Sequence, residues 1–277
     1  MNDTPASQLI NSLIETCNIS SRLDIELVIM SVLEIDKNIL YRDDPSLTKT
    51  DLDRIIKLIE RRENGEPLAY LTNNIGFWNL DLFINRQVLV PRPETEVLVE
   101  KVLNSFDCER RQVLDLGTGS GAIGLALAKE RPDWLITCTD VSFDSLKVAS
   151  INMTKNSLYV NLVNADWLNS FKTNYFDIII SNPPYIDPLD PRILSDGLLH
   201  EPRKALVSES NGLGDIKKIA KEGSKILVDK GYLFLEHGYD QSDKVVDILN
   251  KNGFSQIKTH KDLNGDDRVC MGQLNRC

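Results

Sequence analysis

The sequence predicts an α/β protein, with a small N-terminal helical domain followed by a doubly wound, mostly parallel seven-stranded sheet whose last strand is antiparallel. Three observations favour this fold: helical periodicity over the first 65 residues, alternation of short apolar strands with helical segments from residue 112, and two closing strands around a hairpin turn. We therefore expect a helical domain at residues 1–72, a β-hairpin linker at 73–90 and a sheet domain at 91–277.

The N-terminal region is predicted to form three helices. Thr4 and Pro5 match the N-cap and the first residue of the first helix. The third helix is expected to start at Thr50 and to stop at Gly65. The second helix begins near Ser21, and its spacing predicts a buried face made of Leu23, Leu27, Met30 and Leu33. None of these helices carries a catalytic constellation of its own.

The periodicity changes after the helices. Residues 77–84 alternate roughly by two, which predicts a strand or hairpin that links the two domains. The tripeptide Pro91-Arg92-Pro93 then interrupts the chain, and a new helix with an acidic first turn is expected over residues 94–103.

Strands and helices alternate through the rest of the chain, which predicts βαβ units. The expected strands are 113–116, 135–139, 160–164, 177–181 and 232–236, and the expected helices are 122–129, 142–152, 216–228 and 243–251. Residues 256–260 and 268–273 flank the hairpin dipeptide Asn264-Gly265, so the chain should end in an antiparallel strand pair.

Composition and charge narrow the classes of function. The chain has 42% hydrophobic and 26% charged residues, as ordinary globular proteins do. No apolar run approaches the roughly 18 residues that a membrane span needs, and the polar N-terminus lacks a secretory signal. Five scattered cysteines and three dispersed histidines suit reduced thiols in a cytoplasmic protein rather than a metal site. A net charge of −9 opposes a nucleic-acid partner held by phosphate contacts.

A glycine-rich turn follows the first strand of the sheet domain, in the segment Asp115-Leu116-Gly117-Thr118-Gly119-Ser120-Gly121. Alternate glycines let the backbone turn tightly and approach a ligand at the positive end of the next helix. Gly119, Gly121 and Gly124 also satisfy the dinucleotide pattern G-x-G-x-x-G, which is weak when it stands alone. Asp115 favours a cationic amino-acid moiety over a pyrophosphate, because its carboxylate would repel phosphate.

Acidic residues also follow the next two strands. Asp140 closes the second strand, where its carboxylate can accept hydrogen bonds from both ribose hydroxyls of a nucleoside or cap the following helix. Asp166 and Trp167 follow the third strand, where an adenine could lie between a carboxylate and an aromatic wall. The carboxyl ends of these strands therefore predict a nucleoside site.

The most specific motif is Asn182-Pro183-Pro184-Tyr185, directly after a buried strand. The side-chain oxygen of Asn182 and the carbonyl of Pro183 could accept both hydrogens of one planar –NH2 group, and Tyr185 could stack on its π face. Such a clamp selects a nitrogen whose lone pair is delocalised into a carbonyl or an aromatic ring.

Together, the glycine-rich turn, Asp140 and the Asn-Pro-Pro-Tyr motif resemble the class I S-adenosylmethionine-dependent amino-methyltransferases. Further segments resemble the peptide chain release factor N5-glutamine methyltransferases, the PrmC/HemK family, over nearly the whole chain. Asn73 departs from this family, which often has glycine there. The further segments are Glu66-Pro67-Leu68-Ala69-Tyr70-Leu71-Thr72, Pro91-Arg92-Pro93-Glu94-Thr95-Glu96, Glu201-Pro202 and Glu236-His237-Gly238.

The resemblance implies an enzyme that transfers a methyl group from S-adenosylmethionine to the glutamine amide in the Gly-Gly-Gln motif of class I release factors, leaving S-adenosylhomocysteine. The release factor would be the partner, docked with help from the helical domain, and no metal is implied. It also implies that Arg92 binds substrate and that Asn182, Pro183, Pro184 and Tyr185 hold the glutamine. The implied cofactor contacts are Asp115, Gly117, Thr118, Gly119, Ser120, Gly121, Asp140, Asp166, Trp167 and Asn182.

Three other functions compete with this one. Methylation of adenine N6 or cytosine N4 in nucleic acid uses a similar –NH2 group, but it needs base flipping and a basic groove. A Rossmann dehydrogenase would leave Asp115 and the Asn-Pro-Pro-Tyr motif without a role. A nucleoside-binding regulatory module would not need the Asn182 clamp. In the leading interpretation catalysis is positioning, because no histidine is predicted to act as a base and His237 is expected to be structural.

Overall fold

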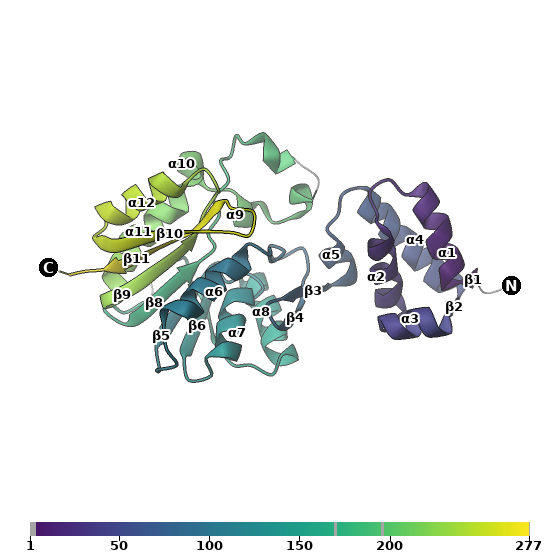
Figure 1. Cartoon of the computed structure of the whole chain (residues 1–277), viewed down its shortest axis with the longest axis horizontal. Helices are drawn as coiled ribbons and strands as arrows, with labels where there is room; N and C mark the ends of the chain where they lie inside the picture. The colour runs from purple at the N-terminus through teal and green to yellow at the C-terminus, as the bar shows by residue number, and fades with distance from the viewer. Residues whose placement is uncertain (1–3, 169–170, 195–196, 277) are drawn as a thin grey trace. The chain divides into compact units, whose positions relative to one another are not determined.

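The computed structural model describes residues 4–168, 171–194 and 197–276 (Figure 1). The chain folds into two compact units. The helical unit comprises the described parts of Met1–Asn74 and Leu194–His200, and the sheet unit comprises those of Ile75–Ile193 and Glu201–Cys277. The short segment after residue 193 thus belongs with the helices, which the sequence did not predict.

The helical unit contains five helices in its described residues, joined by one small pair of strands. They are α1 (Ala6–Thr16), α2 (Arg22–Leu33), α3 (Lys37–Asp43), α4 (Lys49–Glu63) and α5 (Leu68–Thr72), with β1 (Thr4–Pro5) paired to β2 (Ser46–Leu47). The 3-10 turn Leu198–His200 belongs to the same unit.

The start of the first helix was predicted wrongly. Thr4 and Pro5 form an antiparallel pair with Leu47 and Ser46, so this stretch is extended rather than helical. Pro5 occupies the capping position with ψ 144° and makes no side-chain cap, and the helix begins at Ala6. Pairing with a distant segment outweighed the local capping signal.

The buried face of α2 was predicted only in part, because Met30 and Leu33 pack against the core but are only partly buried. The buried residues include Ile25, Val28, Ile29 and Val32, whereas Leu23 is 53% exposed. The helix RLDIELVIMSVL is apolar around most of its circumference, so spacing alone selects no single stripe. Its N-cap, however, is Ser21 in a complete capping box with Asp24, as its sequence position indicates.

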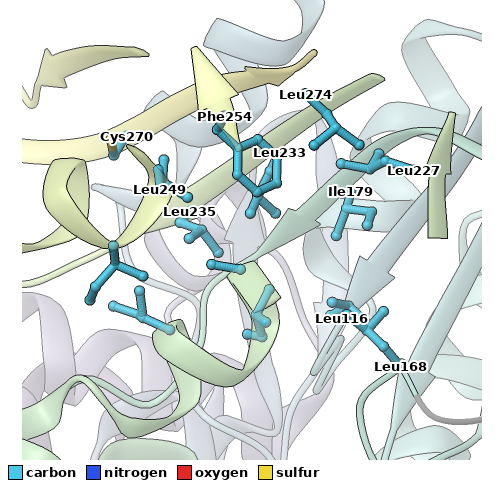
Figure 2. Close-up of a cluster of buried hydrophobic side chains, with 14 of the residues drawn as sticks. Leu116, Leu168, Ile179, Leu227, Leu233, Leu235, Leu249, Phe254, Cys270 and Leu274 are labelled. Atoms are coloured by element: carbon cyan, nitrogen blue, oxygen red, sulfur yellow. The ribbon is translucent and has the colours of Figure 1, made fainter. Parts of the chain in front are cut away.

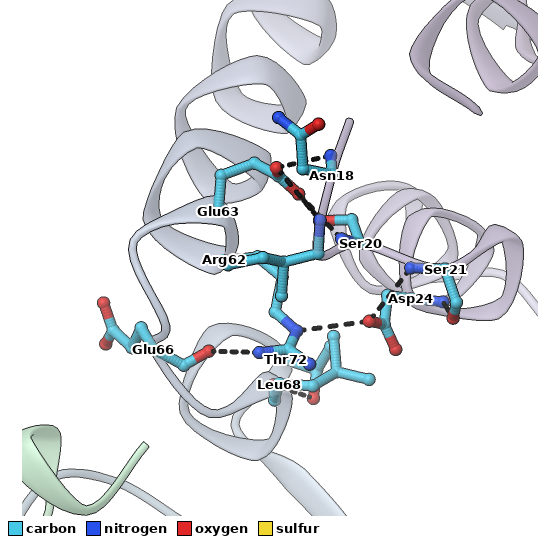
Figure 3. Close-up of polar contacts among 10 residues, drawn as sticks. Asn18, Ser20, Ser21, Asp24, Arg62, Glu63, Glu66, Leu68 and Thr72 are labelled. Carbon is cyan, nitrogen blue, oxygen red and sulfur yellow. Dashed lines mark hydrogen bonds and ion pairs between the residues drawn. The ribbon is translucent and has the colours of Figure 1, made fainter. Parts of the chain in front are cut away.

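A carboxylate on α4 holds the turn between α1 and α2 (Figure 3). Glu63 accepts backbone N–H hydrogen bonds from Asn18 at 2.8 Å and Ser20 at 2.7 Å, and from Ile19 between them. Partial burial works against ionisation, but these hydrogen bonds lower the pKa of Glu63 to about 2. Nearby, Arg62 pairs with Asp24 at 3.2 Å and so joins α4 to the first turn of α2.

The sheet unit confirms the predicted fold class. Its seven strands lie in the order β10-β11-β9-β8-β5-β6-β7, and β11 alone among them is antiparallel to both of its neighbours. The strands are β5 (Gln112–Leu116), β6 (Leu135–Asp140), β7 (Asn161–Asn164), β8 (Phe176–Ser181), β9 (Leu227–Glu236), β10 (Phe254–Lys261) and β11 (Asp267–Leu274).

Helices accompany these strands, and a separate hairpin precedes them. The hairpin pairs β3 (Asn74–Phe77) with β4 (Leu80–Phe83). The longer helices are α6 (Thr95–Ser105), α7 (Ala122–Glu130), α8 (Phe143–Lys155), α11 (Gly214–Ile226) and α12 (Ser242–Lys251), and short turns cover Pro191–Leu194, α9 (Arg203–Leu206) and α10 (Glu209–Gly212).

A continuous apolar core fixes the strands against α11 and α12 (Figure 2). Leu116 on β5, Ile179 on β8 and Leu235 on β9 are all fully buried. Leu249 of α12 and Phe254 of β10 pack into the same cluster. The strands that precede the functional motifs are therefore anchored by side chains that cannot move without opening the core.

We predict that Glu63→Gln lowers the free energy of unfolding of the helical unit by about 1–2 kcal/mol at neutral pH, because a charged acceptor of several N–H groups becomes neutral. Folding lowers the pKa of Glu63 from 4.5 to about 2. The stabilisation that Glu63 contributes is therefore fully present above pH 4.5 and is lost as the pH falls towards 2. The difference between the two proteins should therefore shrink over that range.

Urea unfolding of the full chain, with hydrogen exchange of residues 18–20, measures this effect. Glu60→Gln is the matched control, because Glu60 is an exposed carboxylate on the same helix. Equal stability of all three proteins at neutral pH would show that Glu63 does not hold the turn.

Candidate functional site

Three motifs meet at the carboxyl ends of adjacent parallel strands. Leu116 of β5 is in register with Thr139 of β6 and with Ser181 of β8. Gly117 and Asn182, which follow their strands, and Asp140, which ends β6, therefore lie at the same edge of the sheet, where open α/β sheets bind ligands.

A cavity of about 440 Å³ opens at this edge. Its size lies within the range typical of small-molecule sites, about 300–1,000 Å³. The lining residues all belong to the sheet unit and include Gln87, Val88, Leu89, Gly117, Gly119, Thr139, Asp140, Val141, Ser142, Ser145, Ala165, Trp167, Asn182, Pro184, Pro202, Arg203, Lys204, Ala205 and Asp215.

The glycine-rich turn forms the floor of the cavity. Gly117, Gly119 and Gly121 have φ values of +68°, +56° and +84°, in the left-handed region that side-chain-bearing residues rarely adopt. The N–H of Thr118 donates to the carbonyl of Thr139 at 2.8 Å, which joins the turn to the neighbouring strand β6. Gly117 and Gly119 line the cavity, and their predicted contact with a ligand stays a prediction. Ser120 is buried and lies outside the lining.

Asp115 lies beneath this turn and does not line the cavity. Its fully buried carboxylate accepts hydrogen bonds from the Thr118 hydroxyl at 2.6 Å and from the N–H of Gly124 at 3.0 Å. Burial raises the pKa of Asp115 to about 6. The carboxylate therefore shapes the turn from below, and its predicted attraction for a cationic moiety stays a prediction.

Asp140 stands at the cavity wall. Its Oδ1 accepts from the N–H of Ser142 at 2.8 Å and its Oδ2 from the N–H of Gly119 at 3.0 Å. Burial raises the pKa of Asp140, and these two N–H groups oppose that rise. The side chain is thus held against the glycine-rich turn while it faces the cavity.

Asp166 and Trp167, which come shortly after β7, have different surroundings. Trp167 lines the cavity, and a Cβ placed on Gly117 would lie 3.7 Å from its ring atom Cζ3. Asp166 is exposed, lies outside the lining and pairs with Lys218 at 3.2 Å. The aromatic wall is therefore in place, whereas the Asp166 carboxylate points to another partner.

The Asn-Pro-Pro-Tyr turn contributes Asn182 and Pro184 to the lining, while Pro183 and Tyr185 lie outside it. The amide Nδ2 of Asn182 donates to the buried Thr95 hydroxyl at 3.1 Å. The Tyr185 hydroxyl donates to Oε1 of the buried Glu236 at 3.2 Å. The side chains of Asn182 and Tyr185, the first and last residues of the turn, are thus hydrogen-bonded to residues that do not line the cavity.

Arg92 forms an ion pair with Glu201, the residue that follows the described segment 197–200. Its guanidinium donates to the carboxylate of Glu201, which also accepts from the N–H of Val90 at 2.9 Å. Glu201 is 6% exposed and lies next to the lining segment that starts at Pro202. The pair therefore holds two walls of the cavity together, and Arg92 itself does not line it.

An asparagine on α8 joins the hairpin to the glycine-rich turn. Asn152, fully buried, accepts from the N–H of Phe83 at 2.6 Å and donates to the carbonyls of Phe83 and Ser120 at 3.0 and 2.9 Å. One turn later, Asn156 accepts from the N–H of Asp81 and donates to its carbonyl. Of these two asparagines, Asn152 is the one that reaches both the strand β4 and the floor of the cavity.

Sequence reasoning did not assign functions to four of these residues: Thr95, Asn152, Glu201 and Glu236. Three of them stand in segments that the family resemblance singled out, but nothing in the spacing shows which distant residue they contact. Among the described residues, no group of three or more His, Cys, Asp or Glu side chains could hold a metal ion. No helix in the described ranges is both long and apolar enough to cross a membrane.

A seven-stranded sheet with one reversed strand, whose strand ends enclose this cavity, is the architecture of a class I methyltransferase. Residues 93–212 match the family described as the methyltransferase small domain, and residues 8–72 match the PrmC N-terminal domain. A methyltransferase from Pyrococcus furiosus has the same fold, with a TM-score of 0.56 and 18% identity over 83% of this chain and 100% of that chain. This class implies S-adenosylmethionine as the methyl donor.

Two curated relatives identify the family within this class. The release factor glutamine methyltransferase of Salmonella typhimurium is 39% identical, over 82% of this chain and 83% of the relative. That of Coxiella burnetii is 37% identical over 97% of both chains. The chain belongs to the release factor glutamine methyltransferase family, which confirms the resemblance stated from the sequence.

We predict that Asn152→Ala both destabilises the sheet unit, by about 2–4 kcal/mol, and weakens S-adenosylmethionine binding, because buried N–H and C=O groups on two segments lose their partner. Asn156→Ala is the matched control, since it contacts the same hairpin without touching the glycine-rich turn. Calorimetric binding of S-adenosylmethionine and thermal unfolding measure the two effects. Equal cofactor affinity in the two variants would contradict a coupling through Asn152.

Proposed function

We propose that this protein transfers a methyl group from S-adenosylmethionine to the side-chain amide nitrogen N5 of the glutamine in the Gly-Gly-Gln motif of class I peptide chain release factors. The observation that carries the proposal is the Asn182 amide at the cavity wall. Its Nδ2 is committed to Thr95, so its Oδ1 is the acceptor available to a substrate N–H. Membership of the family supplies the identity of the substrate.

The cavity fits the proposed cofactor on chemical grounds. Its floor is glycine backbone, its wall offers the Asp140 carboxylate for ribose hydroxyls, and Trp167 supplies an aromatic surface for adenine. Asp115, Thr118, Ser120 and Gly121 shape the turn from behind. Asp166 lies outside the lining and its carboxylate is paired with Lys218, so its assignment to the adenine rests on its position shortly after β7.

In the proposed reaction the sulfonium supplies an electrophilic methyl group. When bound, S-adenosylmethionine would supply this methyl group to the amide nitrogen, and the products would be the methylated amide, S-adenosylhomocysteine and one proton. Asn182 Oδ1 and the Pro183 carbonyl hold the two N–H groups and stabilise positive charge that develops on nitrogen. Pro184 lines the cavity and keeps the turn rigid, and we assign Tyr185, which lies outside the lining, a stacking contact of its ring with the planar amide. Orientation of two reactants can contribute about 7–11 kcal/mol.

Arg92 and the helical unit serve the protein substrate in this proposal. Arg92 keeps 35% of its side-chain surface exposed while bound to Glu201, so it can still meet an incoming chain. The helical unit matches the N-terminal domain of the family and would help to dock the release factor. Because release factors act on ribosomes, the enzyme would work in the cytoplasm and modulate translation termination, without binding nucleic acid itself.

Methylation of adenine N6 or cytosine N4 in nucleic acid is the alternative function, because Asn182 and Pro183 could also hold the –NH2 group of a base. The net charge of −9 and the names of the relatives both oppose it. Transfer of labelled methyl from S-adenosylmethionine to a release factor tests the proposal, with DNA and a release factor whose Gly-Gly-Gln glutamine is replaced as controls. Label in DNA, or label in the replaced release factor, would refute it.

We predict that Asn182→Ala and Asp140→Ala separate turnover from cofactor binding. Asn182→Ala should lower kcat about 100-fold, as loss of one preorganised polar group does, with little change in S-adenosylmethionine affinity. Asp140→Ala should weaken that affinity by about 1.5–3 kcal/mol, the range for charged hydrogen bonds.

Steady-state methyl transfer and calorimetry measure these two quantities. Asp144→Ala, which removes an exposed carboxylate from α8, is the matched control for Asp140→Ala and should behave as the wild type. Small and equal effects of the first two variants on both quantities would rule out their assigned roles.

A further inference from the structure

The last residue of the Asn-Pro-Pro-Tyr turn, Tyr185, is held at two atoms by the loop that follows β9. Its hydroxyl donates to Oε1 of Glu236 at 3.2 Å, and its backbone carbonyl accepts from Nε2 of Gln241 at 2.9 Å. Glu236 ends β9, and Gln241 directly precedes α12. The loop 236–241 therefore fixes both the side chain and the backbone of Tyr185.

The amide of Gln241 can take only one orientation. Gln241 is 6% exposed, and its Oε1 accepts from the N–H of Gly238 at 2.9 Å. Its Nε2 donates to the carbonyl of Tyr185 and, at 3.4 Å, to that of Asn211. A backbone N–H can only donate and a backbone carbonyl can only accept, so a reversed amide would lose all of these hydrogen bonds. Gln241 thus places a donor at a fixed position in front of the Tyr185 carbonyl.

A strained turn packs against the same carbonyl. Ser210, Asn211 and Gly212 follow one another with φ values of 57°, 60° and 76°, all in the left-handed region. Left-handed residues that carry side chains are strained and persist only where the surrounding structure enforces them. A Cβ added to Gly212 would overlap the carbonyl oxygen of Tyr185 and lie 2.8 Å from Nε2 of Gln241. The strained turn therefore brings a backbone without a side chain against Tyr185, where only glycine fits.

The residue after Tyr185 joins this arrangement to the chain that leads into the strained turn. The N–H of Ile186 donates to the carbonyl of Leu206 at 3.0 Å, and the N–H of Ser208 donates to the carbonyl of Ile186 at 3.0 Å. The Ile186 N–H thus reports, independently of any substrate, whether the end of the Asn-Pro-Pro-Tyr turn stays in place.

We infer that Gln241 and Gly212 are positioning residues, which set where the Tyr185 end of the turn lies and so place the Tyr185 ring for the substrate amide. This role rests on the proposed function, and in particular on the stacking contact assigned to Tyr185. Neither Gln241 nor Gly212 lines the cavity, so both act through Tyr185. The loop that contains the Glu236-His237-Gly238 motif thereby acquires a task next to the site.

Gln241→Met tests this role, because it keeps an unbranched side chain of similar length and removes the amide donor. We expect kcat to fall about 10- to 100-fold, since a shift of about 1 Å near the reacting groups can cost about 100-fold. The KM for the release factor and the Kd for S-adenosylmethionine should change less than about threefold. Steady-state methyl transfer and calorimetry measure these values.

Gln273→Met is the matched control for Gln241→Met. Gln273 on β11 also donates from its side-chain amide to a backbone carbonyl, that of Lys230 at 3.1 Å, and it lies outside the cavity lining. This variant should leave kcat, KM and Kd unchanged.

Gly212→Ala tests the role from the other side of the carbonyl. The added Cβ would push the Tyr185 carbonyl away, so we expect kcat to fall at least as far as in Gln241→Met, with a change in the Kd for S-adenosylmethionine of less than about threefold. Gly265→Ala is the matched control, because Gly265 has a φ of 87° and an added Cβ there would meet open space. It introduces the same backbone strain without the overlap and should keep the wild-type kcat.

Hydrogen exchange measures the position of the turn without substrate. The Ile186 N–H should exchange about tenfold faster in Gln241→Met than in the wild type or in Gln273→Met. Wild-type kcat in either Gln241→Met or Gly212→Ala would overturn the role. A loss of cofactor affinity as large as the loss of kcat would overturn it as well, because the effect would then not act through Tyr185.

If the wild type methylates no release factor, the proposed function fails on its own. The exchange of the Ile186 N–H then decides separately whether Gln241 holds the turn, and unchanged exchange refutes that role.

Discussion

The register of three parallel strands is the constraint on which the site depends. Because Leu116 of β5 lies opposite Thr139 of β6 and Ser181 of β8, the residues that follow these three lie at one level of the sheet edge. A slip of one residue in any strand would turn its apolar side chains out of the core and displace its motif. The buried leucines and isoleucines shown in Figure 2 thus determine where Gly117 and Asn182 lie.

Buried carboxyl groups hold in place the loops that follow these strands. Asp115 supports the glycine-rich turn, Glu201 joins two cavity walls, and Glu236 stands behind the Asn-Pro-Pro-Tyr turn. Burying such groups is costly unless they are hydrogen-bonded, and Asp115 and Glu201 each accept from two groups, whereas Glu236 accepts from Tyr185. The hydrogen bonds that offset desolvation thereby fix loops that have no regular structure of their own.

Much of the fold could be predicted from the sequence, because the signal for each strand is local. The five short apolar segments and the two segments that flank the Asn264-Gly265 turn needed no knowledge of their partners, and neither did the glycine-rich turn. The face of α2 could be predicted only in part, since a helix that is apolar nearly all round gives no stripe. The links from Asn182 to Thr95 and from Arg92 to Glu201 join residues 87 and 109 positions apart, so no spacing reveals them.

The distribution of charge around the cavity explains how an acidic protein suits this chemistry. Asp115 below the glycine-rich turn and Asp140 at the wall both have pKa values raised by burial, so each favours a nearby positive charge that stabilises its ionised form. A cationic methyl donor provides such a charge, whereas a pyrophosphate would oppose it. Under the proposed function, the same carboxylates that weigh against nucleic acid through the net charge would favour a cationic methyl donor at the site.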